Sequence, residues 1–561
     1  MVHFRRIIAG RIKQIVMQTM RTEKTRINAI TALYWLMLVC LSFAFAACQP
    51  DKTQAGTSLV YGLTLRPSGF DPHIHQSSEL GIVFRQVYDT LVYRDPDTME
   101  IVPGLAQSWE ISDDRLTYTF ILRQDVSFHD GTTFNARAVA ANLDRILDQS
   151  DPQTISQRAQ FMLGPLQRYD VVDDFTIRLQ LSEPYTPLLD SLAQVYLGMA
   201  SPQALLEYPR DTYQFHQVGT GPFKLAEFVP GSRIVLEPNP AYNWGPEFYQ
   251  IDERSLPDQI IFRFFDDPPT RRPALESGDI DIIGELLPLD ARTLIGNGVF
   301  RLQPVSVPGQ PIQLFMNTGE YPTDNTTFRQ ALIYGTNRQA IVDSIFQGFA
   351  SVAWGPITQP TLYFDRSLIG LYDYDPTMAR SMLESIGFSD ADGNGYMDDG
   401  DGDLEVVIVH ASWSQLPDTV QLIRDQWRAI GVRAVIEPVA GFPALIARAR
   451  EGNYNLISFD TSGLDPSLLN QFYLSTGANN FSQFQSADLD NLLIQASQEL
   501  APSIRRSLYA QIQTAIMNQA LVLPIRERVN LNATNVRVND LQFDAYGWFP
   551  LLYNISVTDD S

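Results

Sequence analysis

Residues 389–403, with the sequence SDADGNGYMDDGDGD, place acidic side chains at short intervals with glycines between them. When Asp390 is taken as position 1, oxygen-bearing residues fall where an EF-hand loop binds calcium, and Gly395 falls at position 6, where such a loop turns sharply. The metal ligands that this spacing predicts are Asp390, Asp392, Asn394, Tyr396, Asp398 and Asp401.

The segments that flank this acidic loop (residues 389–403) limit what calcium could do there. The sequence predicts a helix over 375–387, with Asp375 as its N-cap and Gly387 as its stop. Residues 404–410, LEVVIVH, predict a strand. An EF-hand sensor moves a pair of helices, and this arrangement lacks the second helix. Two readings stay open, a structural calcium ion or an acidic turn without an ion, and we expect that no cofactor is required.

The sequence contains none of the common motifs for nucleophilic, zinc or phosphate chemistry. It has no Gly-x-Ser-x-Gly elbow, no His-Glu-x-x-His helix and no phosphate-binding glycine loop. The chain has 64 acidic residues, so the paired carboxylates of a secreted glycoside hydrolase are the enzyme alternative that remains. A calcium-dependent surface-binding or adhesion module is a third class. We expect a protein that is not an enzyme.

The N-terminal segment has the three parts of an export signal. Seven basic residues and one acidic residue precede an uncharged apolar run over 29–47, which ends in small residues. The FAAC sequence at 45–48 resembles the lipobox of bacterial lipoproteins, in which the cysteine becomes the lipidated first residue. We expect a signal peptide over 1–47, lipid on Cys48, a polar tether over 49–58, and a membrane-anchored location facing the periplasm or exterior. An uncleaved membrane span is the alternative.

Length, net charge and cysteine content narrow the classes of fold and of partner that this chain could have. With 561 residues, of which 45% are hydrophobic, the chain is long enough for two or more packed lobes. Its net charge of −23 disfavours nucleic acid as a partner, because phosphate backbones would repel it. Cys40 and Cys48 are the only cysteines, so the processed chain has no internal disulfide.

Strands and helices alternate along the body of the chain, which is typical of α/β layers. Helical spacing covers 81–95, and a second helix follows Asn135, its expected N-cap. Residues 223–239 predict a hairpin that turns at Pro230-Gly231. Residues 324–346 predict a helix broken near Gly335, and residues 418–439 predict a helix, a glycine stop and a strand.

Residues 103–146 contain a series of motifs that resembles the signature of family 5 solute-binding proteins, the oligopeptide, dipeptide and nickel receptors of ATP-driven importers. Further matches follow in the order of that family, so the resemblance covers roughly residues 58–550. The shared pieces are Pro103-Gly104-Leu105-Ala106, Trp109, Tyr118-Thr119-Phe120, Leu122-Arg123, Phe128-His129-Asp130-Gly131, GTGPFKLAEFVPG at 219–231, ESGDIDI at 276–282, FMNT at 315–318 and LVLPI at 521–525.

The resemblance implies an α/β clamshell of two lobes, the periplasmic-binding-protein fold, with an extra subdomain in lobe I. Lobe I would comprise residues 59–310 and 522–556, with the subdomain at about 96–235, and lobe II would comprise 311–521. A peptide or other small polar solute would bind between the lobes, and closure would present the receptor to permease and ATPase subunits. We expect a monomer.

The resemblance also implies where the ligand is held. In peptide receptors of this family, an aspartate three places before the aspartate of Asp-Pro pairs with the ammonium group of the peptide. That position is Ser462 here, with Asp460 two residues earlier, so an opine, a sugar or another polar solute stays open beside a peptide. The ligand-binding residues implied are His75, Gln76, Ser77, Asn317, Trp354, Trp413, Ser414, Phe459, Asp460, Thr461, Ser462 and Asp465.

Overall fold

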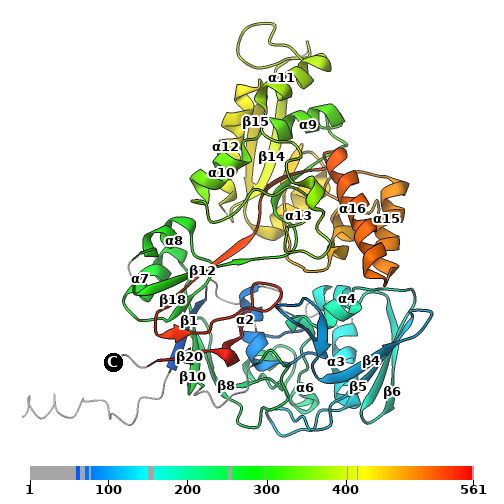
Figure 1. Cartoon of the computed structure of the whole chain (residues 1–561), viewed down its shortest axis with the longest axis vertical. Coiled ribbons are helices and arrows are strands. Elements are labelled where there is room, and N and C mark those ends of the chain that lie inside the picture. The colour runs from blue at the N-terminus through cyan, green and yellow to red at the C-terminus, as the bar shows by residue number, and fades with distance from the viewer. Residues whose placement is uncertain are drawn as a thin grey trace, which may run out of the picture. The chain divides into compact units, whose positions relative to one another are not determined.

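Two mixed β-sheets form the centre of the fold, and the chain crosses between them twice. The structure is a computed structural model that describes residues 58–63, 70–74, 78–148, 157–249, 256–296, 298–400, 402–413 and 415–558. Figure 1 shows each sheet with its helices. The seven-stranded sheet with its surroundings is called the first lobe here, and the five-stranded sheet with its helices is called the second lobe.

Strand β1 (Ser58–Leu63) is the central parallel strand of the first lobe, because it pairs in parallel with β10 on one side and with β11 on the other. The other neighbours are antiparallel. Strands β8 and β9 form the hairpin predicted over 223–239, with Gly231 at positive φ in its turn. The remaining strands are β8 (Phe223–Val229), β9 (Arg233–Pro238), β10 (Gln259–Phe264), β11 (Ile282–Ile283), β12 (Phe300–Ser306) and β18 (Val529–Asn535).

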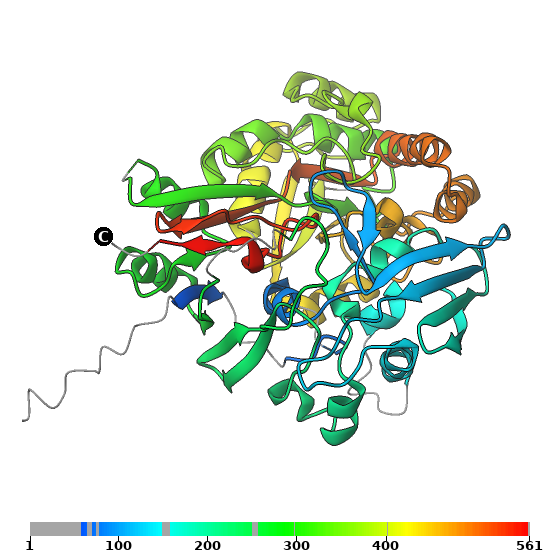
Figure 2. The same cartoon turned by 60° about the horizontal axis from the view of Figure 1, so that its bottom comes forward.

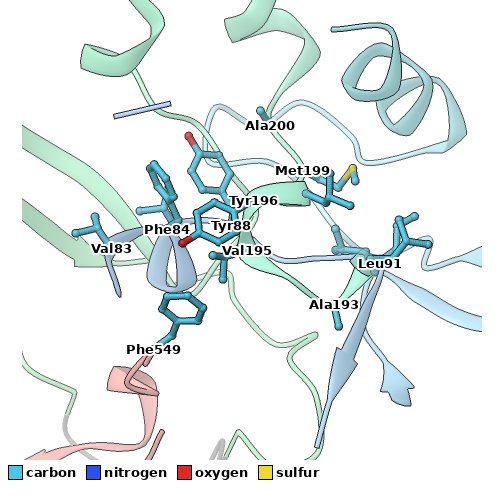
Figure 3. Packing of buried hydrophobic residues seen from close by; sticks show 14 of the residues in the cluster. Val83, Phe84, Tyr88, Leu91, Ala193, Val195, Tyr196, Met199, Ala200 and Phe549 are labelled. Carbon is cyan, nitrogen blue, oxygen red and sulfur yellow. The ribbon is translucent and has the colours of Figure 1, made fainter. Parts of the chain in front are cut away.

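Helix α2 (Ser78–Val87) packs its apolar side into the core of the first lobe (Figure 3). Phe549, from the C-terminal part of the chain, meets Tyr196 edge to face with ring centroids 6.3 Å apart. Gly81 makes room for that ring, since a Cβ atom at this position would lie 2.2 Å from Phe549. Segments far apart in sequence therefore share one core.

The prediction of one helix over 81–95 is wrong, because the helix ends at Val87. The buried carboxylate of Asp89 accepts hydrogen bonds from the hydroxyl groups of Tyr93 at 2.6 Å and Tyr242 at 3.0 Å. The chain therefore leaves the helical path after Val87, so that Asp89 can reach Tyr242 as well as Tyr93, and it then forms a short strand. This strand is β2 (Val92–Arg94), which pairs with β3 (Ile101–Pro103).

A separate antiparallel sheet in the order β4-β5-β7-β6 carries the signature motifs of residues 103–146. Helix α3 (Ala136–Leu147) contacts β6 and β7, and the Asn135 side chain caps it as predicted by accepting from the Ala138 amide at 3.0 Å. The strands are β4 (Ala106–Ile111), β5 (Thr117–Leu122), β6 (Leu166–Asp173) and β7 (Thr176–Leu181). Other elements of this lobe are α4 (Gln157–Met162), α5 (Leu188–Leu192), α6 (Pro202–Glu207), α7 (Arg271–Glu276), α8 (Pro288–Leu294), β19 (Val538–Asn539) and β20 (Ser556–Val557).

The sheet of the second lobe has the order β15-β14-β16-β13-β17. Strand β14 (Glu405–Ala411) runs parallel to β15 (Arg433–Val439) and β16 (Leu456–Ser458), and α12 (Leu416–Ala429) and α13 (Gly441–Glu451) connect them. Since parallel crossovers are right-handed and these two run in opposite directions, α12 and α13 cover opposite faces. The other strands are β13 (Ile312–Met316) and β17 (Val522–Arg526).

The helices of the second lobe follow the sequence closely. Helices α9 and α10 are separate on either side of Gly335, and Asp375 caps α11 by accepting from the Met378 amide at 2.8 Å. Strand β14 follows the acidic loop, as predicted. The helices are α9 (Thr326–Tyr334), α10 (Arg338–Ile345), α11 (Pro376–Ser385), α14 (Asn470–Tyr473), α15 (Ala487–Gln498) and α16 (Pro502–Asn518).

The two crossings between the lobes lie side by side. Strands β12 and β18 pair in the first lobe down to Ser306 and Val529, while β13 and β17 pair in the second lobe from Ile312 and Arg526. Figure 2 shows the red strand β18 beside the green strand β12. The crossing segments are therefore residues 307–311 and 527–528.

Candidate functional site

A cleft of about 560 Å³ is lined by residues of both lobes. Its lining combines apolar, aromatic and charged side chains, as ligand cavities commonly do. The first lobe contributes Glu79, Arg271, Glu285, Leu286, Leu287, Val529, Asn530, Leu531 and Trp548, the second lobe contributes Ile312, Ser412, Trp413, Gln415, Pro417, Asp418 and Arg526, and the return crossing contributes Arg528.

The sheet topology explains why a cleft forms at this place. Glu285 follows the parallel strand β11, and Trp413 follows the parallel strand β14. Strand β14 lies between β15 and β16, so the chain direction across the sheet reverses beside it. In open α/β sheets, ligands bind outside the carboxyl ends of strands at such a reversal. Both sheets direct strand ends of this kind toward the cleft.

Two residues of the lining have an uncommon backbone conformation. Glu285 has a φ of 50° and Gln415 has a φ of 55°, and neither is a glycine. Positive φ at such residues costs free energy and is concentrated at functional sites. Gln415 precedes helix α12, and its side chain makes no capping hydrogen bond to that helix.

The side chains of Arg526, Glu527 and Arg528, where the chain returns from the second lobe to the first, point alternately to opposite sides of the chain. Arg526 and Arg528 line the cleft, whereas Glu527 lines a different pocket of about 400 Å³. This alternation is the normal period of an extended strand. Arg526 is 8% exposed, its Nη1 donates to the Glu527 carbonyl at 2.9 Å, and its guanidinium carbon lies 3.9 Å from the centre of the Phe346 ring. Burial lowers the pKa of Arg526 to about 9, which leaves it protonated at neutral pH.

Several buried polar atoms around the cleft have no hydrogen-bond partner within the part of the chain that the structure describes. They include Nε of Arg271 and Nε of Arg526, Nη1 of Arg528 and the indole Nε1 of Trp548. Arg271 donates its other guanidinium groups to the carbonyl oxygens of Gly284 and Glu285. Unpaired buried donors are costly, so their concentration here indicates that groups beyond the described residues satisfy them.

Of the residues that the resemblance implies for ligand binding, Trp413 lines the cleft and is 37% exposed. Asp460 follows strand β16, which neighbours β14, the strand that Trp413 follows. The Oδ2 of Asp460 is 3.3 Å from Nε of Arg528. Asp460 therefore faces the crossing segments, with its charge engaged by an arginine of this chain. A ligand role for both residues stays a prediction.

The segment 459–462 is bonded to residues 307–311, where the chain first crosses from the first lobe to the second. The carbonyl oxygen of Thr461 accepts from the Gln310 amide at 2.8 Å, and Ser462 forms an isolated bridge with Gly309. Gly309 has a φ of 127°, and a Cβ atom there would lie 2.3 Å from the Thr461 oxygen. The ring of Phe459 packs among aromatic residues of the second lobe, 5.5 Å from the centre of the Phe472 ring.

Three other residues of the implied set make contacts away from this cleft. The amide of Asn317 is buried and donates to the carbonyl oxygens of Gly452 and Tyr454. Asp465 is buried, and its two oxygens accept from Arg505 at 2.6 and 2.8 Å. Trp354 stacks on the guanidinium of Arg338, whose carbon lies 4.6 Å from the ring centre.

Several predicted residues lie outside the described part of the chain. They are His75, Gln76, Ser77 and Ser414 of the ligand set, Asp401 of the metal set and the lipidation residue Cys48. In the described residues, no helix is both long and apolar enough to cross a membrane.

The acidic loop is exposed and folds on itself through short-range hydrogen bonds. The Gly395 amide donates to Asp390 at 3.2 Å, and the Ala391 amide donates to Asp398 at 3.1 Å. Asn394 donates to Asp392 and to Asp403 from the same amide nitrogen. The ring of Tyr396 is covered by Arg433, 4.6 Å from its centre. No cluster of acidic, histidine or cysteine side chains suited to a metal occurs among the described residues.

Sequence reasoning missed the arginines of the cleft. The signal that could have found them is RER at 526–528, where alternating charges follow directly on the apolar run LVLPI at 521–525. Alternation places Arg526 and Arg528 on one side of the chain. Arg271 carries no such signal, because its place in the cleft depends on the position of α7 in the fold.

Comparisons with known proteins give a consistent result. The family model described as “Bacterial extracellular solute-binding proteins, family 5 Middle” matches residues 100–483. Heme-binding protein A of Haemophilus influenzae is 29% identical over 93% of this chain and 98% of that protein. Glutathione-binding protein GsiB of Salmonella typhi is 32% identical over 64% of this chain and 66% of that protein.

A solved structure shows the same fold. The crystal structure of NikA from Brucella suis in complex with Fe(III)-EDTA aligns with a TM-score of 0.79 at 24% identity, covering 89% of this chain and 100% of that chain. The two-lobed α/β fold predicted for this chain is thereby confirmed.

Proposed function

Because this chain belongs to family 5 of the bacterial extracellular solute-binding proteins, it is a solute receptor, and we propose that its solute binds in the cleft between the two lobes. The observation that carries the proposal is a group of buried donors that have no partner among the described residues, on Arg271, Arg526, Arg528 and Trp548. A solute with acceptor oxygens would satisfy them.

The solute is a peptide or another small polar molecule, and the receptor passes it to the permease and ATPase subunits of an importer. Binding favours the arrangement in which both lobes contact the solute, because only that arrangement gives the full set of interactions. The two crossing segments, residues 307–311 and 527–528, are where the chain would bend. The family is one of receptors rather than enzymes, so the solute is released unchanged.

The receptor acts outside the cytoplasm as a monomer held by lipid on Cys48. The basis for the anchor is the sequence FAAC after an apolar run. Incorporation of a radiolabelled fatty acid into the wild-type chain and not into a Cys48→Ala variant is the expected result.

The receptor function is tested by mass spectrometry of small molecules released when the purified protein is denatured, followed by calorimetry with the identified solute. Truncation of Trp413, which lines the cleft, is expected to weaken binding by about tenfold. The matched variant Trp109→Ala, which removes a ring of β4 packed against the core of the first lobe, is expected to cost stability and to leave the affinity unchanged. A solute chemically altered by the protein, or equal losses of affinity in both variants, would contradict the proposal.

A further inference from the structure

The arginines on the two sides of the cleft differ in how far nearby carboxylates offset their positive charge. On the side of the first lobe, Arg271 has acidic neighbours, because Glu285 and Glu79 both favour its charged form against the effect of burial. On the side of the return crossing, Arg528 is ion-paired with Asp460. Arg526 has no ion-pair partner among the described residues. Its positive charge is disfavoured most by burial and also by Arg528, and the charge of Asp460 offsets these effects only in part.

Glu527 does not supply the missing negative charge. It follows Arg526 in sequence, but its side chain faces the pocket of about 400 Å³ on the opposite side of the strand. Burial raises the pKa of Glu527 to about 7, so the carboxyl is not a dependable anion at neutral pH. Among the described residues, the carboxylate of Asp460 therefore acts on two guanidinium groups, because it is ion-paired with Arg528 and also favours the charge of Arg526.

The N-terminus of helix α12 lies at the same cleft, since Gln415, Pro417 and Asp418 are all in its lining. A helix N-terminus carries a partial positive charge, and this helix has 14 residues. Asp418 in the first turn is exposed to water and so offsets this charge only in part. The helix end and the buried guanidinium of Arg526 come from different elements, yet both line the same cleft and favour negative charge in it.

From this arrangement, and resting on the proposed receptor function, we propose that the solute is an anion whose oxyanion group, a carboxylate or a phosphate, binds between Arg526, Arg528 and the start of α12. Guanidinium groups hold such oxyanions through paired hydrogen bonds. A buried cation without a counter-charge is costly, and the bound oxyanion supplies that charge. Because Arg526 and Arg528 flank the point where the chain crosses between lobes, the anion also connects binding to the relative position of the lobes.

The test uses metabolites below about 1 kDa from a growth medium, a size well above that of ligands suited to such a cleft. The mixture is separated at neutral pH into material retained by an anion exchanger, material retained by a cation exchanger, and unretained material. Each fraction is incubated with the protein, and captured solute is identified by accurate mass, which also separates a carboxylate from a phosphate. We expect capture from the anion-exchange fraction alone, and affinity reduced about tenfold or more in Arg526→Gln.

The control variant Arg380→Gln removes the same charge from the exposed surface of α11 and is expected to capture as the wild type does. If Arg526→Gln does not fold, as judged by its thermal melt, the less buried Arg528→Gln decides, with the same loss expected. Capture only from the cationic or unretained fractions, or undiminished capture by the arginine variants, overturns the anion proposal while the receptor function stands. Failure to capture any solute from any fraction overturns both.

Discussion

At the scale of single residues, Glu527 shows how a strand can place opposite charges in separate environments. Its neighbours Arg526 and Arg528 reach the cleft, while Glu527 itself is 5% exposed and its carboxyl accepts one hydrogen bond, from the Gln359 backbone amide at 2.9 Å. The second carboxyl oxygen has no partner among the described residues. Burial is therefore the main influence on this group, and it raises the pKa from 4.5 to about 7.

The raised pKa predicts a pH-dependent loss of stability. Below about pH 4.5 the carboxyl is neutral in both the folded and unfolded states, and as pH rises through about 7 the buried anion destabilises the folded state. We expect Glu527→Gln to raise the free energy of unfolding at pH 8 by about 2–3 kcal/mol and to change it little at pH 4. Urea unfolding at the two pH values measures this, with the exposed Glu384→Gln as control. An equal effect at both pH values would contradict the prediction.

The Asp465–Arg505 pair predicts the opposite pH dependence. Burial alone would raise the pKa of Asp465, but the charge and hydrogen bonds of Arg505 outweigh it, so the pKa lies below its usual value. Such a group stabilises the fold above about pH 4, and this stability is lost as pH falls through the folded-state pKa. Asp465→Asn leaves Arg505 buried without its partner and is expected to cost about 3–5 kcal/mol at pH 7.

Urea unfolding from pH 7 down to pH 3 measures this difference, which should shrink in acid. The exposed Asp425→Asn is the control variant. Since Asp465 is absent from the cleft lining, the folded variant should bind the solute as the wild type does. A selective loss of affinity would instead support the ligand role that the family resemblance implies for Asp465.

At the scale of elements, the acidic loop predicts a local effect of calcium. The loop connects α11 to β14, and those of its residues that the structure describes are absent from the cleft lining. We expect calcium in the range of about 0.1–1 mM to raise the melting temperature and to leave the affinity for solute nearly unchanged. The variant Asp392→Asn should lose the thermal shift, with Asp425→Asn as control. A large change of solute affinity on adding calcium would contradict this prediction.

Local signals in the sequence were sufficient to predict most elements of the second lobe. The N-cap Asp375, the break at Gly335 and the strand after the acidic loop all appear as predicted, because each depends on residues close in sequence. The helix over 81–95 failed for the opposite reason. Asp89 is fixed by Tyr242, more than 150 residues away, and no local pattern contains that contact. Arg271 was missed on the same ground, since its place in the cleft depends on where α7 lies in the fold.

At the scale of the whole molecule, contacts other than the two crossings also join the lobes. Thr186 donates from its amide to the Ser497 carbonyl at 2.9 Å and from its hydroxyl to the Glu499 carbonyl at 3.0 Å. Arg115 donates to the Gln498 carbonyl at 3.0 Å. Arg115 lies in the turn between β4 and β5, and Thr186 lies after β7. Their bonds connect this part of the first lobe to residues 497–499 at the end of α15, so they favour the arrangement of lobes seen here.

Removing the side-chain bonds between the lobes should speed the release of solute. In the double variant Arg115→Gln and Thr186→Val, we expect the dissociation rate to rise by up to about thirtyfold, because the two bonds that are removed contribute about 1 kcal/mol each. Stopped-flow measurement of solute release tests this. The control Arg168→Gln removes an arginine that contacts Gln180 within the first lobe, and its rate should match the wild type. Equal rates in all three proteins would mean that these contacts do not govern release.

Strand β1, where the described chain begins, and strand β20, where it ends, both belong to the first lobe. A solid support attached near either of these strands would therefore hold the first lobe and leave the second lobe unattached to the support. The protein is thus suited to use as a surface-mounted biosensor, in which a fluorophore on an exposed second-lobe position such as Tyr374 reports the approach of the lobes without a label at the cleft.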